Sequence, residues 1–188
     1  MVTVRQARPQ DAAEMGRVMV ASWLAGHRGQ VSDRAWQRRR DDWTPEVSAR
    51  AWQRALLQRD ALGDRSPDCY LLAEDDRGSM VAVAFGSVDR ADPRAVFGEV
   101  QALYVDPTQH RRGVGRCLLQ QLAGCLADRG ATSIEIGVLT ANHDARRFYE
   151  ALGGQFAGER LIEEDGEELP QSIYVWPDIT SLLPPPRA

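Results

Sequence analysis

The sequence predicts a mixed α/β fold, with a mostly antiparallel sheet that contains one parallel strand pair and is flanked by helices. Two patterns carry this prediction. Strand-like runs at 69–75 and 79–89 flank the turn Asp76-Arg77-Gly78, which is typical of an antiparallel hairpin. From residue 96 onward strands alternate with helices, and residues 96–139 match one strand–loop–helix–strand unit. Such a unit joins two parallel strands by a right-handed crossover.

The first residues are expected to form a strand followed by a helix. Residues 3–7 form the strand, and Asp11 caps the helix, with Glu14 completing a capping box three residues later. The apolar residues of this helix recur at helical spacing: Met15, Val18, Met19 and Trp23.

Residues 33–60 are expected to form two further helices. Ser32 caps the first, and Thr44 followed by Pro45 starts the second, because proline suits the first helical position. The tryptophans of this region are assigned to packing rather than to a ligand cage: Trp36, Trp43 and Trp52.

The second half of the chain alternates strands and helices. Ala91-Asp92-Pro93 breaks the preceding strand, and Asp106-Pro107 ends the next one, because proline cannot donate to a strand ladder. The expected strands are 96–105, 134–139, 155–162 and 172–176, and the expected helices are 113–129, which Gly130 ends, and 142–152. An acidic hairpin containing Asp165-Gly166 joins the last two strands.

Composition limits the partners. The net charge of −4 argues against nucleic acid. No apolar run approaches the roughly 20 residues that span a bilayer, and residues 1–8 lack the apolar core of a secretory signal. We therefore expect a cytoplasmic protein without a membrane partner.

The three cysteines, Cys69, Cys117 and Cys125, are expected to be reduced thiols. Their number is odd, and no CxxC pair suggests a disulfide framework or a metal site. If Cys117 and Cys125 share a helix, their spacing places them about 12 Å apart along it, too far for a bridge. Both are interpreted as small packing residues.

The segment most informative about chemistry is QALYVDPTQHRRGVGRCLL, residues 101–119. A strand ends, an arginine-rich loop follows, and a helix opens at Gly113-Val114-Gly115. The start of a helix exposes unpaired N–H groups and the positive end of the dipole, and glycine lets a ligand approach the backbone. With Arg111, Arg112 and Arg116, the loop predicts an anion site suited to a pyrophosphate.

Two familiar phosphate motifs are excluded here. A P-loop requires a lysine, and this chain has none. The dinucleotide fingerprint requires a third glycine at the position that Leu118 occupies.

The sequence resembles the GNAT superfamily of acetyl-CoA-dependent N-acetyltransferases. The sharpest matches are GEVQALYVDPTQHRRGVGRCLL and VLTANHDARRFYEALGG. In the family's Gln/Arg-x-x-Gly-x-Gly/Ala loop, Gly113 and Gly115 match and His110 departs from the pattern. The resemblance implies a single GNAT-like domain over 1–188, with the parallel strands splayed apart.

The resemblance also implies how this domain is divided. Acceptor-side helices occupy about 11–60, an acetyl-CoA-binding core about 96–152, and a C-terminal hairpin about 155–176.

The resemblance further implies a set of acetyl-CoA contacts. A bulged strand at 99–105 would splay from the strand at 134–139, so that the pantetheine arm lies between them. The implied binding residues are the strand residues Leu103, Tyr104 and Val105, the loop residues His110, Arg111, Arg112, Gly113, Val114, Gly115 and Arg116, and Asn142.

Two residues are candidates for proton transfer by the same resemblance. Glu99 occupies a position where several family members carry a catalytic glutamate, and it would act as the general base, directly or through water; a solvent-facing edge-strand carboxylate is the alternative. Tyr149 occupies the place of the family's general acid, and its alternative is a packed aromatic residue beside Phe148. No metal is expected.

The predicted function is acetyl transfer from acetyl-CoA to a primary amine of a small molecule or peptide. The alternative is a non-catalytic CoA-binding regulatory module of the same fold. The acceptor amine, the size of the acyl group and the oligomeric state are not encoded in a recognisable motif, although dimers are common in the family.

Two charged clusters are interpreted as solvated surface. Arg34 and Arg38 to Arg40 form an exposed helix face rather than a nucleic-acid contact. The acidic turn at 163–168 is solvated as well, although beside an amine-binding site it could attract a cationic substrate.

Overall fold

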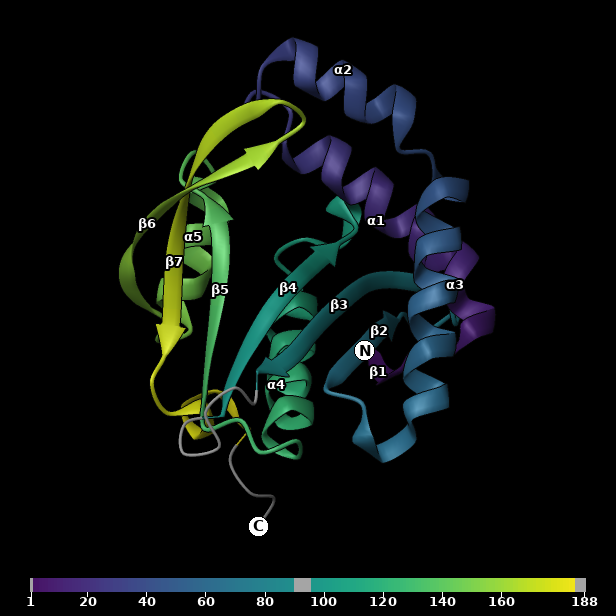
Figure 1. Ribbon diagram of the computed structural model, residues 1–188, viewed down its shortest axis with the longest axis vertical. Coiled ribbons are helices and arrows are strands. Elements are labelled where there is room, and N and C mark those ends of the chain that lie inside the picture. Colours follow the sequence, from purple (N-terminus) through teal and green to yellow (C-terminus); the bar gives the residue numbers. More distant parts are fainter. Residues whose placement is uncertain (1, 90–95, 185–188) are drawn as a thin grey trace.

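The computed structural model describes residues 2–89 and 96–184, so the strand break expected at Ala91-Asp92-Pro93 lies outside the described residues. Within them the strands form a seven-stranded sheet in the order β1-β2-β3-β4-β5-β7-β6 (Figure 1). The strands are β1 (Thr3–Gln6), β2 (Asp68–Glu74), β3 (Met80–Asp89), β4 (Phe97–Val105), β5 (Ser133–Leu139), β6 (Gln155–Glu164) and β7 (Glu167–Trp176). Neighbours pair antiparallel except β4 and β5, which are parallel, as the sequence predicted.

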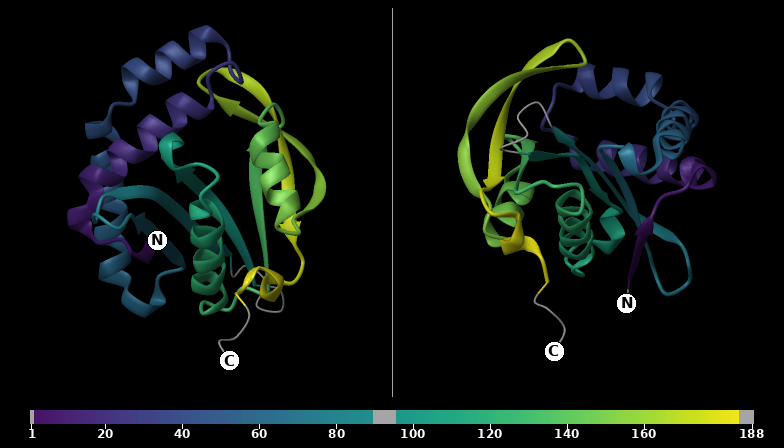
Figure 2. Two further views of the ribbon diagram at one scale, coloured as in Figure 1. Left: turned by 180° about the vertical axis from the view of Figure 1, so that it is seen from behind. Right: turned by 60° about the horizontal axis from the view of Figure 1, so that its bottom comes forward.

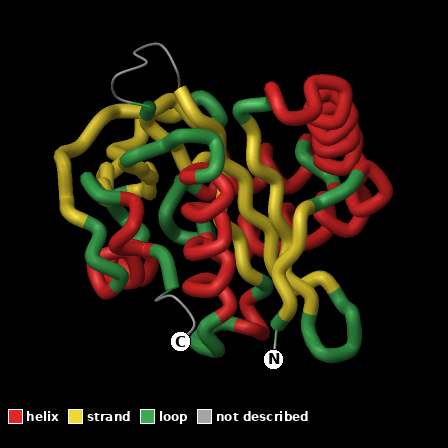
Figure 3. The backbone as a smooth tube through the Cα atoms, turned by 90° about the horizontal axis from the view of Figure 1, so that it is seen from below, coloured by secondary structure: helices red, strands yellow, loops and turns green. Residues whose placement is uncertain are grey.

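Helices cover both faces of this sheet. They are α1 (Ala12–Gly26), α2 (Asp33–Asp42), α3 (Pro45–Leu62), α4 (Val114–Ala127) and α5 (His143–Ala151). Figures 2 and 3 show α1 and α3 on one side of the strands and α4 and α5 on the other. None of the described helices is both long and apolar enough to cross a membrane.

The side chains of β2 contribute to two hydrophobic cores, one on each face of the sheet. Cys69, Leu71 and Ala73 pack in the core that α4 shares, whereas Tyr70 and Leu72 pack with α1 and α3. Successive side chains of a strand point to opposite faces, so a continuous apolar run is what a strand covered on both faces requires.

The face of α4 that meets the sheet consists of fully buried leucines: Leu118, Leu119, Leu122 and Leu126. Truncating one such leucine to alanine typically costs about 2–5 kcal/mol of stability. The hydrophobic stripe that predicted this helix is therefore also what fixes its position against the sheet.

The caps of α2 and α3 are confirmed, and the predicted cap of α1 is wrong. Ser32 Oγ accepts from the Ala35 amide over 3.1 Å, and Thr44 Oγ1 accepts from the Val47 amide over 3.4 Å. Asp11 sits at the start of α1 without capping it.

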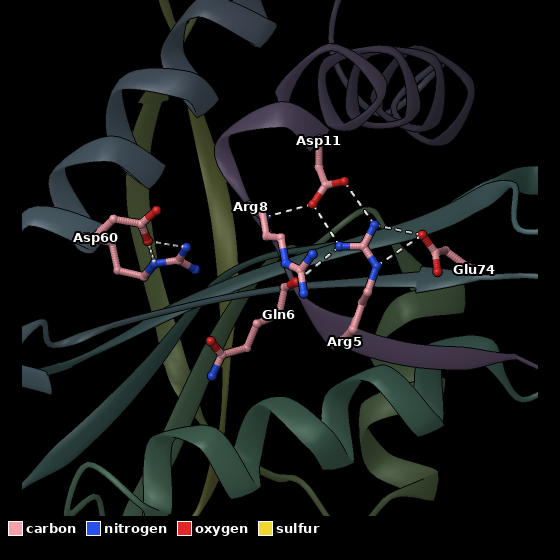
Figure 4. A network of polar contacts seen from close by, with 7 residues as sticks. Arg5, Gln6, Arg8, Asp11, Asp60 and Glu74 are labelled. Carbon is pink, nitrogen blue, oxygen red and sulfur yellow. Dashed lines mark hydrogen bonds and ion pairs between the residues drawn. The ribbon is translucent and has the colours of Figure 1, made fainter. Parts of the chain in front are cut away.

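Asp11 is held instead by a network that ties β1 to the sheet (Figure 4). Its carboxylate receives two hydrogen bonds from Arg5, 2.8 and 2.9 Å long, and one from the Arg8 amide at 2.7 Å. Arg5 also contacts Glu74 of β2 at 2.7 Å. The hydrogen bond from the Arg5 guanidinium is the largest of the influences that hold the pKa of Asp11 below its ordinary value. This carboxylate therefore pairs with Arg5 and does not cap α1.

The expectation of three free thiols is wrong. Cys69 of β2 and Cys125 of α4 form a disulfide, with Cα atoms 6.2 Å apart, and Cys117 is the free thiol. The sequence excluded only a Cys117–Cys125 bridge. The pairing that forms depends on α4 crossing β2, which the spacing of cysteines does not reveal.

The last hairpin is longer than predicted. Strands β6 and β7 continue to a two-residue turn at Asp165-Gly166, whose φ angles are 52° and 80°. Two consecutive positive φ values define the tight turn that favours Asp-Gly between strands. The acidic residues on either side of this turn pair within the strands, Glu163 with Glu168 and Glu164 with Glu167. Of the acidic residues near the turn, Glu164 and Asp165 contact Arg39 of α2.

Candidate active site

Strands β4 and β5 part halfway along β4. The last pair that joins them is Val100 with Ile136, and no further pair forms among the described residues. On the β3 side, Gln101 is an extra residue, because Val100 and Ala102 pair with consecutive residues of β3. This bulge turns the end of β4 away from β5. The predicted bulge and splay are both confirmed.

The end of β4 leads directly into the arginine-rich loop. Asp106 Oδ1 accepts from the Thr108 amide at 2.9 Å and from its hydroxyl at 2.7 Å, which shapes a short turn. Gly113 then precedes α4 with φ 79°, a left-handed conformation that favours glycine. No side chain caps α4, so the amides of its first turn have no hydrogen-bond partner in the part of the chain that the structure describes.

Three exposed arginines lie beside or among these amides in the sequence: Arg111, Arg112 and Arg116. Arg111 has φ 59°, which is uncommon for a residue other than glycine. A helix start with unpaired N–H groups and added positive charge is a binding site for a phosphate or pyrophosphate.

Gly115 is not required by the packing of the chain. A Cβ at this position would lie 3.4 Å from the Phe148 ring and 3.6 Å from Val105, which are ordinary contacts. The protein therefore leaves the backbone open here without steric need, as expected where a ligand approaches the amides.

His110, the departure from the family loop, has a local structural contact. Its Nε2 atom lies 3.0 Å from the carbonyl oxygen of Val105 and so ties the loop to the end of β4. The carbonyl of Val105, a residue predicted to contact pantetheine, thus already accepts one hydrogen bond within the chain.

Of the residues predicted to contact pantetheine, three lie on the splayed part of β4, and Asn142 lies between β5 and α5. Leu103, Tyr104 and Val105 pair with 82–84 of β3 on one edge, and β5 does not pair with the other edge. Asn142 Oδ1 accepts from the Ala145 amide at 3.1 Å and caps α5. Its Nδ2 group makes no hydrogen bond to a described residue, so both N–H donors of this amide are available to a ligand.

Tyr149 of α5 is buried against aromatic neighbours. Its ring lies 5.3 Å from Phe148, 6.0 Å from Tyr174 and 6.2 Å from Trp176. Burial, with a smaller contribution from Tyr104, raises its pKa well above the ordinary value. Its hydroxyl makes no hydrogen bond to another described residue. It is not one of the fully buried polar atoms that lack a hydrogen-bond partner, which are Ser22 Oγ and Gln30 Oε1. The hydroxyl is therefore protonated and within reach of solvent.

Glu99 lies on the face of the sheet toward α1 and α3, where β4 and β5 are still paired. Its side chain is 38% exposed, and Glu135 is its partner in register on β5. Arg160 of β6 lies 3.8 Å from Glu99 and 3.7 Å from Glu135. Burial, and secondarily the Glu99 charge, raises the pKa of Glu135, whereas Arg160 lowers it. Because β4 is a central strand, the interpretation of Glu99 as an edge-strand residue is wrong.

One boundary of this face is a contact between α2 and the β6–β7 turn (Figure 1). Arg39 lies 2.7 Å from Asp165 and 3.2 Å from Glu164. Ser32 donates to Glu167 through its hydroxyl and its amide. The interpretation of these arginines and of the acidic turn as solvated surface is therefore wrong for the residues that form this α2–hairpin contact. Their opposite charges neutralise one another where α2 meets the β6–β7 turn.

His27, which the sequence analysis did not single out, also reaches this site. It follows α1, and its ring stacks on Trp23 with centroids 4.5 Å apart. Its ring centroid lies 6.4 Å from that of Tyr104, in the splayed part of β4. The i, i+4 spacing of Trp23 and His27 was the available signal, because it places both side chains on one helix face.

Among the described residues no group of three or more His, Cys, Asp or Glu side chains could hold a metal ion. The side chains gathered at the splay are instead an arginine-rich helix start, a buried tyrosine, paired carboxylates and a histidine. These groups can bind an anion and move protons.

Comparison with known sequences identifies relatives of this chain. The model of the acetyltransferase (GNAT) family matches residues 32–154. The N-acetyltransferase YuaI of Bacillus subtilis is 27% identical over 183 residues, which is 97% of this chain and 96% of that protein. A mycothiol acetyltransferase of Salinispora tropica is 30% identical over 155 residues, 81% of this chain but only 44% of that longer protein.

Solved structures share the fold. The structure of yncA from Salmonella typhimurium with its cofactor acetyl-CoA has a TM-score of 0.67 at 19% identity. The similarity covers 94% of this chain and 93% of that one. At this identity the likeness extends to the fold alone.

Proposed function

The chain belongs to the acetyltransferase (GNAT) family and is an N-acetyltransferase by that membership, and we propose that it transfers an acetyl group from acetyl-CoA to a primary amine. The observation that carries the proposal is the open start of α4 at the end of the splayed strand. Its unpaired amides, its arginines and Gly115, where packing does not require a glycine, would provide the anion site that a CoA pyrophosphate requires.

The proposed binding groups lie on the loop before α4, on the splayed part of β4 and at the start of α5. Arg111, Arg112 and Arg116, with the amides from Gly113 to Arg116, would hold the pyrophosphate. The unpaired edge of Leu103 to Val105 and the Nδ2 group of Asn142 would hold the pantetheine arm. When bound, acetyl-CoA would supply an activated thioester carbonyl.

Two residues of this chain would move protons during the transfer. Glu99, on the acceptor face, would take a proton from the ammonium group, directly or through water, because only the free amine attacks. Tyr149 would give its proton to the departing sulfur. Its raised pKa keeps the hydroxyl protonated at neutral pH, which is the state a proton donor needs.

The acceptor would approach from the side of α1 to α3. Residues 11–60 and the hairpin 155–176 border that face, and the α2–hairpin contact closes one end of it. The core at 96–152 would hold acetyl-CoA, and the whole chain would act as one domain.

A panel of primary amines tests the proposal. The intact protein is incubated with acetyl-CoA and each amine, and release of CoA thiol is followed together with the mass of the product. Thiol release that depends on one class of amine, with a product heavier by one acetyl group, is expected. Tight CoA binding without turnover on any amine would instead favour the non-catalytic CoA-binding module.

A further inference from the structure

The proposed acetyl transfer leaves the acceptor of one proton unassigned. A primary ammonium loses two protons on becoming an amide nitrogen, and the departing sulfur gains one. Glu99 takes the first proton from nitrogen, and Tyr149 supplies the proton on sulfur. The second proton on nitrogen passes to a base of the site, which is either the phenolate that Tyr149 becomes or another side chain.

The tautomer of His27 leaves one ring nitrogen available as a base. Its Nδ1 atom lies 3.0 Å from the carbonyl oxygen of Trp23. Because a carbonyl only accepts, Nδ1 must carry a proton in this contact, and Nε2 of the neutral ring then carries a lone pair.

The Nε2 atom has no competing partner. It makes no hydrogen bond to any residue in the described part of the chain. It is not one of the fully buried polar atoms without a hydrogen-bond partner, which are Ser22 Oγ and Gln30 Oε1, so it retains contact with solvent. The Trp23 stack and the Nδ1 hydrogen bond fix the ring, and the Tyr104 ring lies 6.4 Å away.

The charges around His27 come from each element that packs on it. Glu164 of β6 and the Trp23 carbonyl of α1 favour the protonated ring, whereas Arg39 of α2 opposes it. Tyr104 of β4 is itself neutral, because burial raises its pKa to about 12. Burial of the imidazole is the largest influence, and the pKa of His27 is lowered overall. The ring is therefore neutral and able to accept a proton at pH 7.

The other two of the three histidines are less suitable. His110 uses Nε2 in its contact with Val105. His143 is exposed at the start of α5.

We propose that Nε2 of His27 accepts the second proton of the acceptor amine. The inference rests on the proposed acetyl transfer. The nitrogen lone pair forms the C–N bond, the C–S bond breaks with its electron pair on sulfur, and sulfur takes the proton of Tyr149. The remaining excess N–H bond breaks, its electron pair stays on nitrogen, and the proton passes to His27. The net balance is one proton released for each ammonium acetylated.

The first test does not depend on turnover. Histidine resonances of the full-length protein are followed by NMR from pH 5 to 8, and His27 is assigned by its loss in His27→Asn. The inference expects the Nδ1–H tautomer and a pKa below the ordinary value of about 6.5. The Nε2–H tautomer, or a pKa at or above that value, would overturn it.

The second test separates a proton acceptor from a structural ring. Asparagine places an N–H donor near the position of Nδ1 and offers no base, whereas glutamine places its polar group near Nε2. Both His27→Asn and His27→Gln should lower kcat by about 10²-fold or more, and the acidic limb of the pH–rate profile should disappear. His143→Gln, with an exposed histidine, is the control that should retain the wild-type rate and profile.

The outcomes distinguish the two proposals. If the wild-type protein acetylates no amine, the proposed function fails, and the NMR result alone decides whether His27 is a neutral base. If the wild type is active and His27→Asn, folded by circular dichroism, keeps its rate and pH profile, the role of His27 is refuted while acetyl transfer stands.

Discussion

Arg39 Nε lies 2.7 Å from Asp165 Oδ2, which joins helix α2 to the tip of the β6–β7 hairpin across 126 residues of sequence. The same guanidinium lies 5.0 Å from the ring of Trp23 and 5.2 Å from that of Trp43. The two side chains are only 23% and 18% exposed, so solvent screens their attraction less than it would at an open surface. Arg39, itself in α2, thus connects α1, the β6–β7 hairpin and the residue that follows α2.

We predict that Arg39→Ala lowers the free energy of unfolding by about 1–2 kcal/mol, because it removes a partly buried ion pair and two ring contacts. Urea titration measures the change, and a double-mutant cycle with Asp165→Ala isolates the coupling between the two residues. Arg40→Ala is the matched control on the same helix, since its partner Asp41 is adjacent and exposed. Equal losses for Arg39→Ala and Arg40→Ala, with an additive cycle, would contradict the role of the α2–hairpin contact.

A second prediction concerns the disulfide. Cys69 and Cys125 are separated by 56 residues, and closing a loop of that length restricts the unfolded chain by an amount worth about 4 kcal/mol in the chain-entropy model. Cys125→Ala should therefore lower stability by about 2–4 kcal/mol, whereas Cys117→Ala should change it little.

Thiol titration checks the pairing directly. The denatured, unreduced protein should show one free thiol, because two of the three cysteines are bridged. Titration of all three under these conditions would show that Cys69 and Cys125 are not joined.

The sequence was informative where the signal is local. Leu118, Leu122 and Leu126 recur on one face and place α4, and Ser32 caps α2 as its position suggested. The loop at 110–116 could be predicted to be an anion site, because free amides at a helix start need no tertiary partner. Contacts between distant segments could not be assigned in this way.

Arg39 illustrates what a single sequence leaves open. The sequence does not separate Arg39 from its neighbours Arg38 and Arg40, and its short distances to Asp165 and Glu164 distinguish it only in the folded chain. The Cys69–Cys125 bridge and the approach of His27 to Tyr104 could not be predicted for the same reason. Each depends on how helices cross the sheet, and such crossings leave no periodic trace in the chain.

Tyr149→Phe tests the proposed proton donor. The change removes one hydroxyl from a buried ring, so folding and acetyl-CoA affinity should remain close to wild type. Steady-state kcat should fall by about 10²–10⁴-fold when chemistry limits the rate.

The neighbouring Tyr174 supplies a matched control, because its hydroxyl already donates to Glu150 at 2.6 Å and accepts from Arg146 at 3.2 Å. Tyr174→Phe should cost about 1 kcal/mol of stability and leave the rate nearly unchanged. Wild-type turnover by Tyr149→Phe on the true acceptor would reduce Tyr149 to a packing residue.

Glu99→Gln tests the proposed base through pH. A lysine-like ammonium titrates near a pKa of about 10.4, so at neutral pH almost every acceptor must lose a proton first. The substitution should lower kcat/KM most at moderate pH and recover in part as pH rises, when free amine becomes abundant.

Glu135→Gln is the control for the charge of the site, since Glu135 lies in register with Glu99 and near the same Arg160. A pH profile of Glu99→Gln that matches wild type would remove Glu99 from the mechanism. Equal effects of the two substitutions would show that their shared negative charge, and not one base, matters.

The start of α4 is proposed to bind the pyrophosphate of CoA, and calorimetric titration with CoA tests this most directly. Gly115→Glu places a carboxylate at the free amides, and the ordinary contacts of a Cβ there allow the protein to fold. Gly113 is less suitable because its φ of 79° would strain any side chain. Gly124→Glu is the control on the same helix, where a Cβ would meet only Leu183 at 3.8 Å. We predict that wild type and Gly124→Glu bind CoA alike and that folded Gly115→Glu does not bind it. Equal affinity of Gly115→Glu and wild type, or no binding by wild type, would contradict the account.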